Sequence, residues 1–221
     1  MFKTINAVLW DLDGTLINSE PLQDLAVVYA TNQIGKSVTL DDIPKGGGLD
    51  NLTIFRMLFA PHKEEIDEDL FNYWQNLTLD YIKHNFAKLV PIHQSIELVH
   101  EFKQMGLIQS IVSNSSSQFI IQCAETLGIN HCMSHMIGRD QVLYGKPDPD
   151  LYLEGLWLND IEAANCLVFE DSTPGIIAAA NAKINNIIGI GQHESIKHLI
   201  KHSCSLNQES WLKDIKDKFF S

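Results

Sequence analysis

The segment 7–16, Ala-Val-Leu-Trp-Asp-Leu-Asp-Gly-Thr-Leu, constrains the fold of this chain more than any other stretch. Its apolar residues predict a buried strand that delivers two carboxylates at alternate positions before the chain turns at Gly14. If the backbone stayed extended, Asp11 and Asp13 would share one side of the strand, where two carboxylates repel unless a cation or a proton joins them. The segment therefore predicts a metal-binding site beyond a strand end, where open α/β sheets bind ligands. A surface turn after an edge strand is the simpler alternative.

Three further segments place polar side chains at the end of an apolar run or beside a turn. They carry Ser113 with Asn114, Lys146, and Glu170 with Asp171. The prolines that follow Lys146 keep its segment extended, and the apolar run before Glu170 repeats the design of the opening strand. Taken alone, each segment has a simpler explanation: a hydroxyl that ends a strand, a solvated surface lysine, or carboxylates that cap the next helix.

In this order the four segments resemble the haloacid dehalogenase superfamily. The match comprises Asp11-Leu-Asp-Gly-Thr, Ser113, Lys146 and Glu170-Asp171, and it covers the core from end to end. The resemblance implies an α/β fold with a doubly wound parallel sheet, a Rossmann-like core and an inserted α-helical cap domain. Within the superfamily, the presence of Asp13 and of the Glu170-Asp171 pair favours phosphoryl transfer over dehalogenation at carbon.

Hydrophobic periodicity predicts the same two-part organisation. Apolar residues recur at helical spacing in three segments before Pro91, which predicts helices over residues 19–35, 49–59 and 64–86. Tyr73 and Trp74 are expected on the buried side of the third helix. After Pro91 helices alternate with strands, as in a doubly wound parallel sheet. The expected domains are a catalytic core of residues 1–17 and 88–221 and a helical cap of residues 18–87.

The resemblance implies a chemical role for each residue of the predicted site. Asp11 is the expected nucleophile, which attacks phosphorus and yields an aspartyl phosphate. Asp13 is the expected general acid and base, which protonates the departing alcohol and then activates the hydrolytic water. Ser113 and the backbone amide of Asn114 are expected to bind phosphoryl oxygens, while Lys146 supplies the compensating positive charge.

Magnesium is the expected cofactor. A hard ion with oxygen ligands would let two anions, the nucleophile and the phosphate, approach each other. The predicted ligands are the Asp11 and Asp171 carboxylates and the backbone carbonyl of Asp13. Glu170 is expected either to bind the metal directly or to support one of its ligands.

These residues predict a magnesium-dependent phosphatase for a small phosphorylated metabolite, such as a sugar phosphate. A β-phosphoglucomutase-like isomerase and a non-catalytic phosphate-binding protein on the same fold are the alternatives. Within the superfamily, the helical cap and the Glu-Asp-Ser sequence at 170–172 look most like the β-phosphoglucomutase and small sugar-phosphate phosphatase group. Mutases of that group place an arginine in the cap loop shortly after a Lys-Gly pair. Here Lys45-Gly46 is present, but Leu49 stands where that arginine would align. Lys45 is therefore a candidate substrate-binding residue, and hydrolysis is preferred to isomerisation.

Net charge, hydropathy and cysteine spacing argue against a nucleic-acid-binding, membrane or zinc-binding protein. The 221 residues carry a formal net charge of −12 at pH 7, which argues against binding nucleic acid or an anionic membrane through a basic surface. No apolar run is long enough to span a bilayer and no signal sequence precedes the first strand, so we expect a cytoplasmic protein, monomeric or weakly dimeric. The four cysteines lack zinc-type spacing and are expected to be reduced and structural.

His131, Cys132 and His135 suggest a transition-metal site at first sight. The two histidines, however, fall where a helix should give way to a strand, and no third ligand is apparent in the sequence. We therefore expect structural or exposed side chains at these positions.

Overall fold

The computed structural model describes residues 5–43, 51–59, 67–191, 193–204 and 211–219. The chain divides into two compact units. The first unit comprises Met1–Asn18 and Val90–Ser221, and the second comprises Ser19–Leu89.

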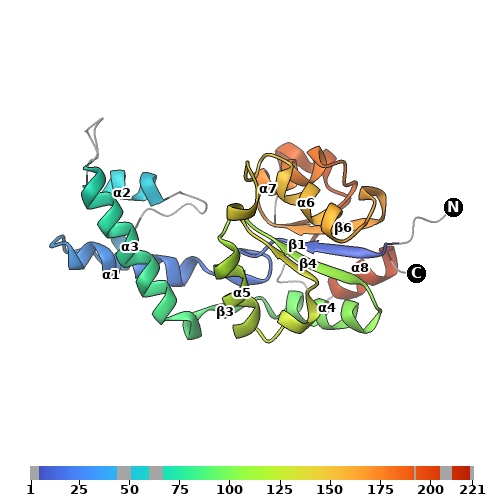
Figure 1. Cartoon of the computed structure of the whole chain (residues 1–221), viewed down its shortest axis with the longest axis horizontal. Helices are drawn as coiled ribbons and strands as arrows, with labels where there is room; N and C mark the ends of the chain where they lie inside the picture. The colour runs from blue at the N-terminus through green and yellow to red at the C-terminus, as the bar shows by residue number, and fades with distance from the viewer. Residues whose placement is uncertain (1–4, 44–50, 60–66, 192, 205–210, 220–221) are drawn as a thin grey trace. The chain divides into compact units, whose positions relative to one another are not determined.

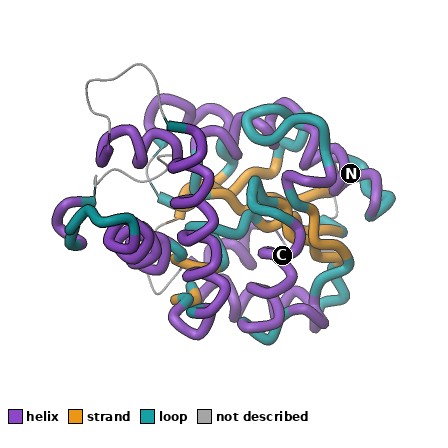
Figure 2. Tube along the Cα trace, turned by 60° about the vertical axis from the view of Figure 1, so that its left-hand side comes forward, coloured by secondary structure: helices purple, strands orange, loops and turns teal. Residues whose placement is uncertain are grey.

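The described part of the first unit contains a six-stranded parallel sheet with the strand order β5-β4-β1-β6-β7-β8 (Figures 1 and 2). Its strands are β1 (Ala7–Trp10), β4 (Ile108–Val112), β5 (His135–Ile137), β6 (Cys166–Glu170), β7 (Asn186–Ile190) and β8 (His202–Cys204). All four residues of β1 are buried, as expected for a central parallel strand covered on both faces. The predicted α/β fold with a doubly wound parallel sheet is confirmed.

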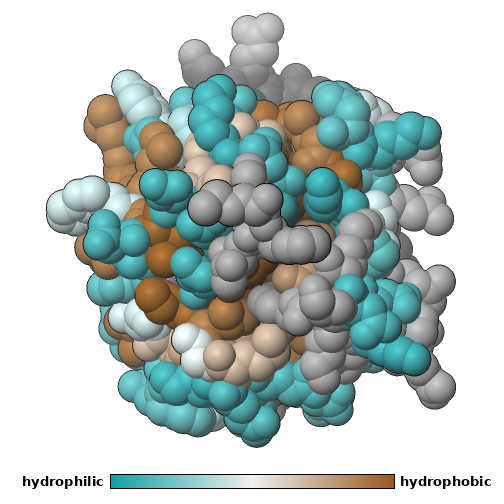
Figure 3. All heavy atoms as spheres, turned by 90° about the vertical axis from the view of Figure 1, so that its right-hand side faces the viewer, coloured by the Kyte–Doolittle hydropathy of each residue, from teal (hydrophilic) through white to brown (hydrophobic). Residues whose placement is uncertain are grey.

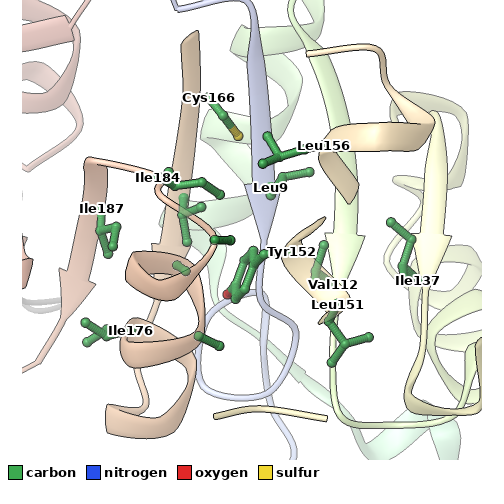
Figure 4. Close-up of a cluster of buried hydrophobic side chains, with 14 residues drawn as sticks. Leu9, Val112, Ile137, Leu151, Tyr152, Leu156, Cys166, Ile176, Ile184 and Ile187 are labelled. Atoms are coloured by element: carbon green, nitrogen blue, oxygen red, sulfur yellow. The ribbon is translucent and has the colours of Figure 1, made fainter. Parts of the chain in front are cut away.

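Helices cover both faces of this sheet. They are α4 (His93–Gln104), α5 (Ser117–Thr126), α6 (Asp150–Leu158), α7 (Thr173–Asn181) and α8 (Trp211–Phe219). Leu9 pairs in register with Val168, and both belong to the core cluster that α6 and α7 complete (Figure 4). One residue further along, Trp10 stacks on Phe169 with ring centroids 4.2 Å apart, and both rings contact Phe102 of α4. Successive side chains along a strand point to opposite faces of the sheet. Leu9 and Val168 therefore pack against α6 and α7, whereas Trp10 and Phe169 pack on the face that α4 covers.

Short elements complete the first unit. β2 (Ile17–Asn18) and β3 (Val90–Pro91) form an antiparallel pair where the chain leaves the first unit and returns to it. The 3₁₀ turns are η3 (Asn130–Cys132), η4 (Arg139–Gln141), η5 (Ala163–Asn165) and η6 (Glu194–Leu199). None of these turns was predicted from the sequence, nor were β8 and α8; the turns and β8 are too short to show a hydrophobic period.

The described residues of the second unit form helices and loops (Figure 2). The elements are α1 (Glu20–Gln33), η1 (Leu40–Asp42), α2 (Asn51–Phe59), α3 (Glu68–His84) and η2 (Phe86–Lys88). Trp74 is completely buried, its Nε1 donates to Thr31 Oγ1 at 2.9 Å, and its ring meets Phe55 edge-on. The expectation that Tyr73 shares this buried side is wrong, since it is 56% exposed. Neighbouring helical residues point about 100° apart, so a stripe that contains Trp74 and Thr78 turns Tyr73 toward solvent.

None of the described helices has the length and apolar character needed to span a lipid bilayer. Hydrophobic side chains lie among hydrophilic ones on the face that Figure 3 shows. Cys123, Cys132 and Cys166 are free and buried, while the side chain of Cys204 falls outside the described part of the chain.

Candidate active site

The segments that the sequence analysis singled out meet at one edge of the sheet. Asp11 directly follows β1, Ser113 directly follows β4, and Glu170 is the last residue of β6. Parallel strands that lie side by side end at the same edge, so three stretches far apart in the sequence deliver their polar residues together. Lys146 joins them from the loop between η4 and α6.

Lys146 is the centre of this group. Its Nζ donates to Asp11 Oδ1 at 2.5 Å, to Glu170 Oε1, and to the carbonyl of Val112 at 3.0 Å, and its side chain is only 4% exposed. Burial alone would lower the pKa of Lys146, but the charges of Asp11 and Glu170 outweigh that effect and raise this pKa above its ordinary value. The ammonium group therefore stays charged at neutral pH.

Glu170 is held by hydrogen bonds to both of its carboxylate oxygens. Oε1 accepts from the Tyr152 hydroxyl at 3.0 Å as well as from Lys146, and Oε2 accepts from the amide and the hydroxyl of Ser172 at 3.0 and 2.9 Å. A Cβ at Gly175 would overlap the Glu170 carboxylate, so a glycine is required there. Ser172, rather than Glu170, caps α7, because its hydroxyl accepts from the Gly175 amide. The buried Glu170 carboxylate is thus fixed in one position.

Asp11, Glu170 and Asp171 form an acidic cluster in which one oxygen of each lies within 4.8 Å of the others; the first two residues are buried and Asp171 is half-buried. Burial and the charge of Glu170 raise the pKa of Asp11 well above its usual range, although Lys146 opposes the shift. The same two causes raise the pKa of Asp171 to about 7. The buried Asp171 Oδ1 has no hydrogen-bond partner among the described residues. Carboxylates that lie this close together and are shielded from water are stable only when a proton or a cation neutralises part of their charge. A cluster of oxygen donors fits a hard divalent ion.

The turn after β1 differs from the extended geometry considered for the sequence. The strand ends at Trp10, and the Leu12 carbonyl accepts from the amides of Leu16 and Ile17 at 2.8 and 3.1 Å. Gly14 adopts a φ of +83°, and a Cβ at that position would overlap the Asp171 carboxylate. Gly14 is therefore needed both for the backbone conformation and for the close approach of Asp171. Strand alternation is not what brings Asp11 and Asp13 to the same edge.

Ser115 positions Asp13, a contact that the sequence analysis missed. The Ser115 hydroxyl donates to Asp13 Oδ2 at 3.1 Å, and the Ser115 amide donates to Ser113 Oγ at 3.0 Å. Ser113 is 3% exposed, and its Oγ accepts this bond, so its own hydroxyl hydrogen can be donated elsewhere. The signal in the sequence was the run of serines after β4, which is typical of a loop that follows a strand.

Asn114 braces the lysine loop with its side chain. Asn114 Oδ1 accepts from the Lys146 amide at 2.8 Å, and Asn114 Nδ2 donates to the Lys146 carbonyl at 3.3 Å. From the sequence, only the backbone amide of Asn114 was expected to take part in the site. The side chain adds a second role, because it fixes the backbone from which the Lys146 ammonium reaches Asp11.

The described residues contain most of the predicted site. The residues brought together at this edge of the sheet are Asp11, Asp13, Ser113, Asn114, Lys146, Glu170 and Asp171. Lys45, the predicted substrate-binding residue of the second unit, and Leu49 lie outside the described residues.

Comparisons with known proteins show the family of this chain. Residues 8–189 match the family model for haloacid dehalogenase-like hydrolases. A phosphorylated carbohydrates phosphatase from Thermotoga maritima is 28% identical over 196 residues, which is 84% of this chain and 85% of that protein. A phosphoglycolate phosphatase from Vibrio cholerae is 31% identical over 190 residues, 81% of this chain and 82% of that protein. The crystal structure of a hydrolase from Pseudomonas syringae has the same fold, with a TM-score of 0.72, 19% identity and coverage of 95% and 99% of the two chains. The chain therefore belongs to the haloacid dehalogenase-like hydrolase family.

Proposed function

We propose that this protein is a magnesium-dependent phosphatase that hydrolyses a small phosphorylated carbohydrate or related metabolite through a phosphorylated Asp11. The observation that carries the proposal is the convergence of Asp11, Lys146 and Asp171 in one buried group at the carboxyl edge of the sheet. Two curated relatives that cover most of the chain are named as phosphatases of phosphorylated carbohydrates and of phosphoglycolate.

Mg²⁺ fits the donor set of this group. We assign its protein ligands to the carboxylates of Asp11 and Asp171 and the backbone carbonyl of Asp13, which are the hard oxygen donors that Mg²⁺ prefers. The buried Asp171 Oδ1, which no described residue engages, supports this assignment. Both oxygens of Glu170 already accept hydrogen bonds, so we give Glu170 the task of holding Lys146 rather than the metal. When bound, Mg²⁺ supplies positive charge that lets the nucleophile and the phosphate approach.

In the first half of the proposed reaction, Asp11 attacks phosphorus. The bond between phosphorus and the ester oxygen breaks, and Asp13 donates its proton to the departing alkoxide, so that an alcohol leaves. Lys146 and the Ser113 hydroxyl stabilise the charge that develops on the phosphoryl oxygens. Ser115 orients Asp13 for this proton transfer through its hydroxyl.

In the second half of the reaction, Asp13 accepts a proton instead of donating one. Its carboxylate takes a proton from water while the water oxygen attacks phosphorus, and the bond between phosphorus and Asp11 breaks. Inorganic phosphate leaves, Asp11 is regenerated as a carboxylate and Asp13 is again protonated. The same two aspartates thus serve both half-reactions, which requires Asp13 to gain and lose its proton within each turnover.

The helical second unit, Ser19–Leu89, is the proposed cap that selects the substrate. Its segment at Lys45 carries a Lys-Gly pair but has Leu49 where a mutase would place an arginine. Without that arginine, a second phosphate that loses water on binding would give up hydration worth several kcal/mol and lack the guanidinium partner that offsets this loss in a mutase. We therefore propose hydrolysis of a monophosphate and not isomerisation of a sugar phosphate.

The protein is expected to release phosphate from a monophosphorylated substrate and to leave the isomers of glucose phosphate unchanged. A panel of p-nitrophenyl phosphate, acetyl phosphate, phosphoglycolate, hexitol phosphates and sugar phosphates, each with Mg²⁺, measures the release. Glucose 1-phosphate with a bisphosphate primer measures isomerisation. Failure to release phosphate from any member of the panel would favour a non-catalytic phosphate-binding protein. Isomerisation at least as fast as phosphate release would instead identify a phosphomutase.

Magnesium is expected to stabilise the fold more at pH 8 than at pH 5. The pKa of Asp171 is raised from 3.8 to about 7 and that of Asp11 is also raised, so the metal-free folded protein holds protons that the unfolded chain has released. The free energy of unfolding of the metal-free protein therefore falls as the pH rises from about 4 to about 7. Mg²⁺ takes the place of these protons only when both carboxyls are ionised.

Thermal unfolding with and without Mg²⁺, at constant ionic strength, measures this effect. At pH 8 and a Mg²⁺ concentration of about a hundred times its Kd, the melting temperature should rise by roughly 5–10 °C. The rise should be much smaller at pH 5 and in Asp171→Asn. Equal shifts at both pH values, or full retention of the shift in Asp171→Asn, would contradict the proposed metal site.

A further inference from the structure

A second group of metal-ligating side chains lies outside the active site. His100 is on α4, while His131 and Cys132 are adjacent in η3. Cys132 Sγ lies 3.8 Å from His100 Nδ1 and 3.4 Å from His131 Nε2. One ring nitrogen of each histidine and the sulfur all lie within 4.8 Å of one another. The third ligand that the sequence did not reveal therefore comes from a helix about thirty residues earlier in the chain.

These distances suit a tetrahedral metal ion. Zinc–sulfur bonds of about 2.3 Å and zinc–nitrogen bonds of about 2.0–2.1 Å, in tetrahedral arrangement, separate the sulfur from a nitrogen by about 3.6 Å. The two observed separations, 3.4 and 3.8 Å, lie on either side of this value. Neither imidazole is buried, so the rings can rotate to complete the geometry and an ion can enter from solvent.

The chemistry of the three ligands differs from that of the active site. A thiolate with two imidazoles selects a borderline transition cation, whereas the carboxylates of the active site select a hard ion. The two groups are also separated by topology. η3 precedes β5 and the end of α4 leads into β4, so the histidine–cysteine group lies at the edge where the parallel strands begin. The active site lies at the opposite edge, where the strands end.

We propose that His100, His131 and Cys132 form a binding site for a divalent transition cation of the zinc type. On binding, the Cys132 thiol releases its proton to solvent, its sulfur bonds to the metal, and the two neutral imidazoles each donate a lone pair. The fourth position is left to water, as in other sites with three protein ligands. The bound ion joins α4 to η3, and this inference does not depend on the proposed phosphatase activity.

Metal binding has to displace the proton of the Cys132 thiol. Burial raises the pKa of the Cys132 thiol, and the charge of Lys103 partly offsets that effect. The free thiol is therefore protonated at neutral pH, where it is a weak hydrogen-bond donor that one imidazole can satisfy. Metal binding replaces this weak hydrogen bond with three coordinate bonds.

Titration with Co²⁺, a spectroscopic substitute for zinc, tests the site directly. The full-length protein, prepared without a histidine tag, is titrated in excess Mg²⁺ so that the carboxylate site is saturated with its hard ion. One equivalent of Co²⁺ should bind with a near-ultraviolet charge-transfer band from thiolate to cobalt and with the strong visible bands of tetrahedral geometry. Addition of Zn²⁺ should remove these bands. A wild-type protein without a charge-transfer band would overturn the proposal.

Single substitutions identify the ligands. Cys132→Ser should abolish the charge-transfer band, and His100→Asn and His131→Asn should each weaken Zn²⁺ binding by at least about tenfold in competition with Co²⁺. The histidine variants change rings that are not buried, so they test the site even where Cys132→Ser disturbs folding. His93→Asn, which alters an exposed histidine two turns earlier on α4, is the matched control and should bind as the wild type does. A band that survives Cys132→Ser, or unchanged affinity in both ligand-histidine variants, would refute the assignment.

Discussion

Replacement of Asp11 by asparagine is expected to abolish phosphate release, lowering the turnover number by at least about a thousandfold. Asparagine keeps the shape of the side chain and an oxygen that can accept the hydrogen bond from Lys146, but an amide cannot attack phosphorus. Because Lys146 also keeps its contacts with Glu170 and the Val112 carbonyl, we expect the variant to fold. Steady-state phosphate release with saturating Mg²⁺ measures the loss, and circular dichroism reports whether the fold is retained.

Asp160→Asn is the matched control for this variant. Asp160 is exposed and lies two residues after the end of α6, on the side of the sheet from which the strands start, and its φ of +52° is one that asparagine tolerates. The same chemical change at this position should leave turnover within about twofold of the wild type. If Asp11→Asn kept substantial Mg²⁺-dependent activity, Asp11 could not be the nucleophile.

Replacement of Asp13 by asparagine is expected to lower turnover by about 10²–10⁴-fold and to trap the phosphorylated enzyme. With a good leaving group such as p-nitrophenolate, formation of the phosphorylated Asp11 needs little help from an acid. Its hydrolysis still needs a base to activate water, so the second half-reaction should slow more than the first. Intact-protein mass spectrometry after rapid quenching should then detect the addition of one phosphoryl group.

The double variant Asp11→Asn/Asp13→Asn is the control for the trapped species. It removes the acceptor of the phosphoryl group, so the added mass should disappear. Ser115→Ala tests the support of Asp13 more gently, because it removes only the hydroxyl that donates to Asp13 Oδ2. Normal turnover of Asp13→Asn without any phosphorylated protein would rule out its role as acid and base.

The close packing of the site depends on two glycines that lie outside the chemistry. Gly14 leaves room for the Asp171 carboxylate, and Gly175 leaves room for the Glu170 carboxylate. A methyl group at either position would displace a carboxylate of the acidic cluster rather than a flexible surface group. The glycine at position 14 can therefore be explained by its close approach to Asp171, which lies more than 150 residues later in the sequence.

The sheet and most of the site could be predicted from the sequence for one physical reason. A strand buried on both faces is expected to be a continuous apolar run, and such runs are visible at β1 and β6 without any structure. β4 departs from this pattern at Gln109 and Ser110, whose buried side chains are hydrogen-bonded, but it ends on the apolar pair Ile111-Val112 before Ser113. Polar residues that follow these runs must lie at the carboxyl edge of the sheet. The positions of Asp11, Ser113 and Glu170 therefore followed from local pattern and parallel topology alone.

Other features depended on contacts that leave no local pattern. The extended backbone considered for Asp11 and Asp13 is not formed, because the strand ends at Trp10 and hydrogen bonds to the Leu12 carbonyl close a turn. The contact between Ser115 and Asp13 spans 102 residues, and the bracing of Lys146 by the Asn114 side chain spans 32. The spacing of residues along the sequence predicts neither of these contacts.

The sequence by itself determined which residues are apolar, where the buried strands end, and hence which carboxylates and which lysine share one edge of a parallel sheet. Only the tertiary structure decided which oxygen meets which donor, how burial shifts the pKa of Asp171 to about 7, and which helix brings His100 to Cys132. The physical reason is that burial pattern is a local property repeated along each element. Hydrogen bonds, desolvation and coordination are properties of atoms a few ångströms apart, which come together only when distant elements pack.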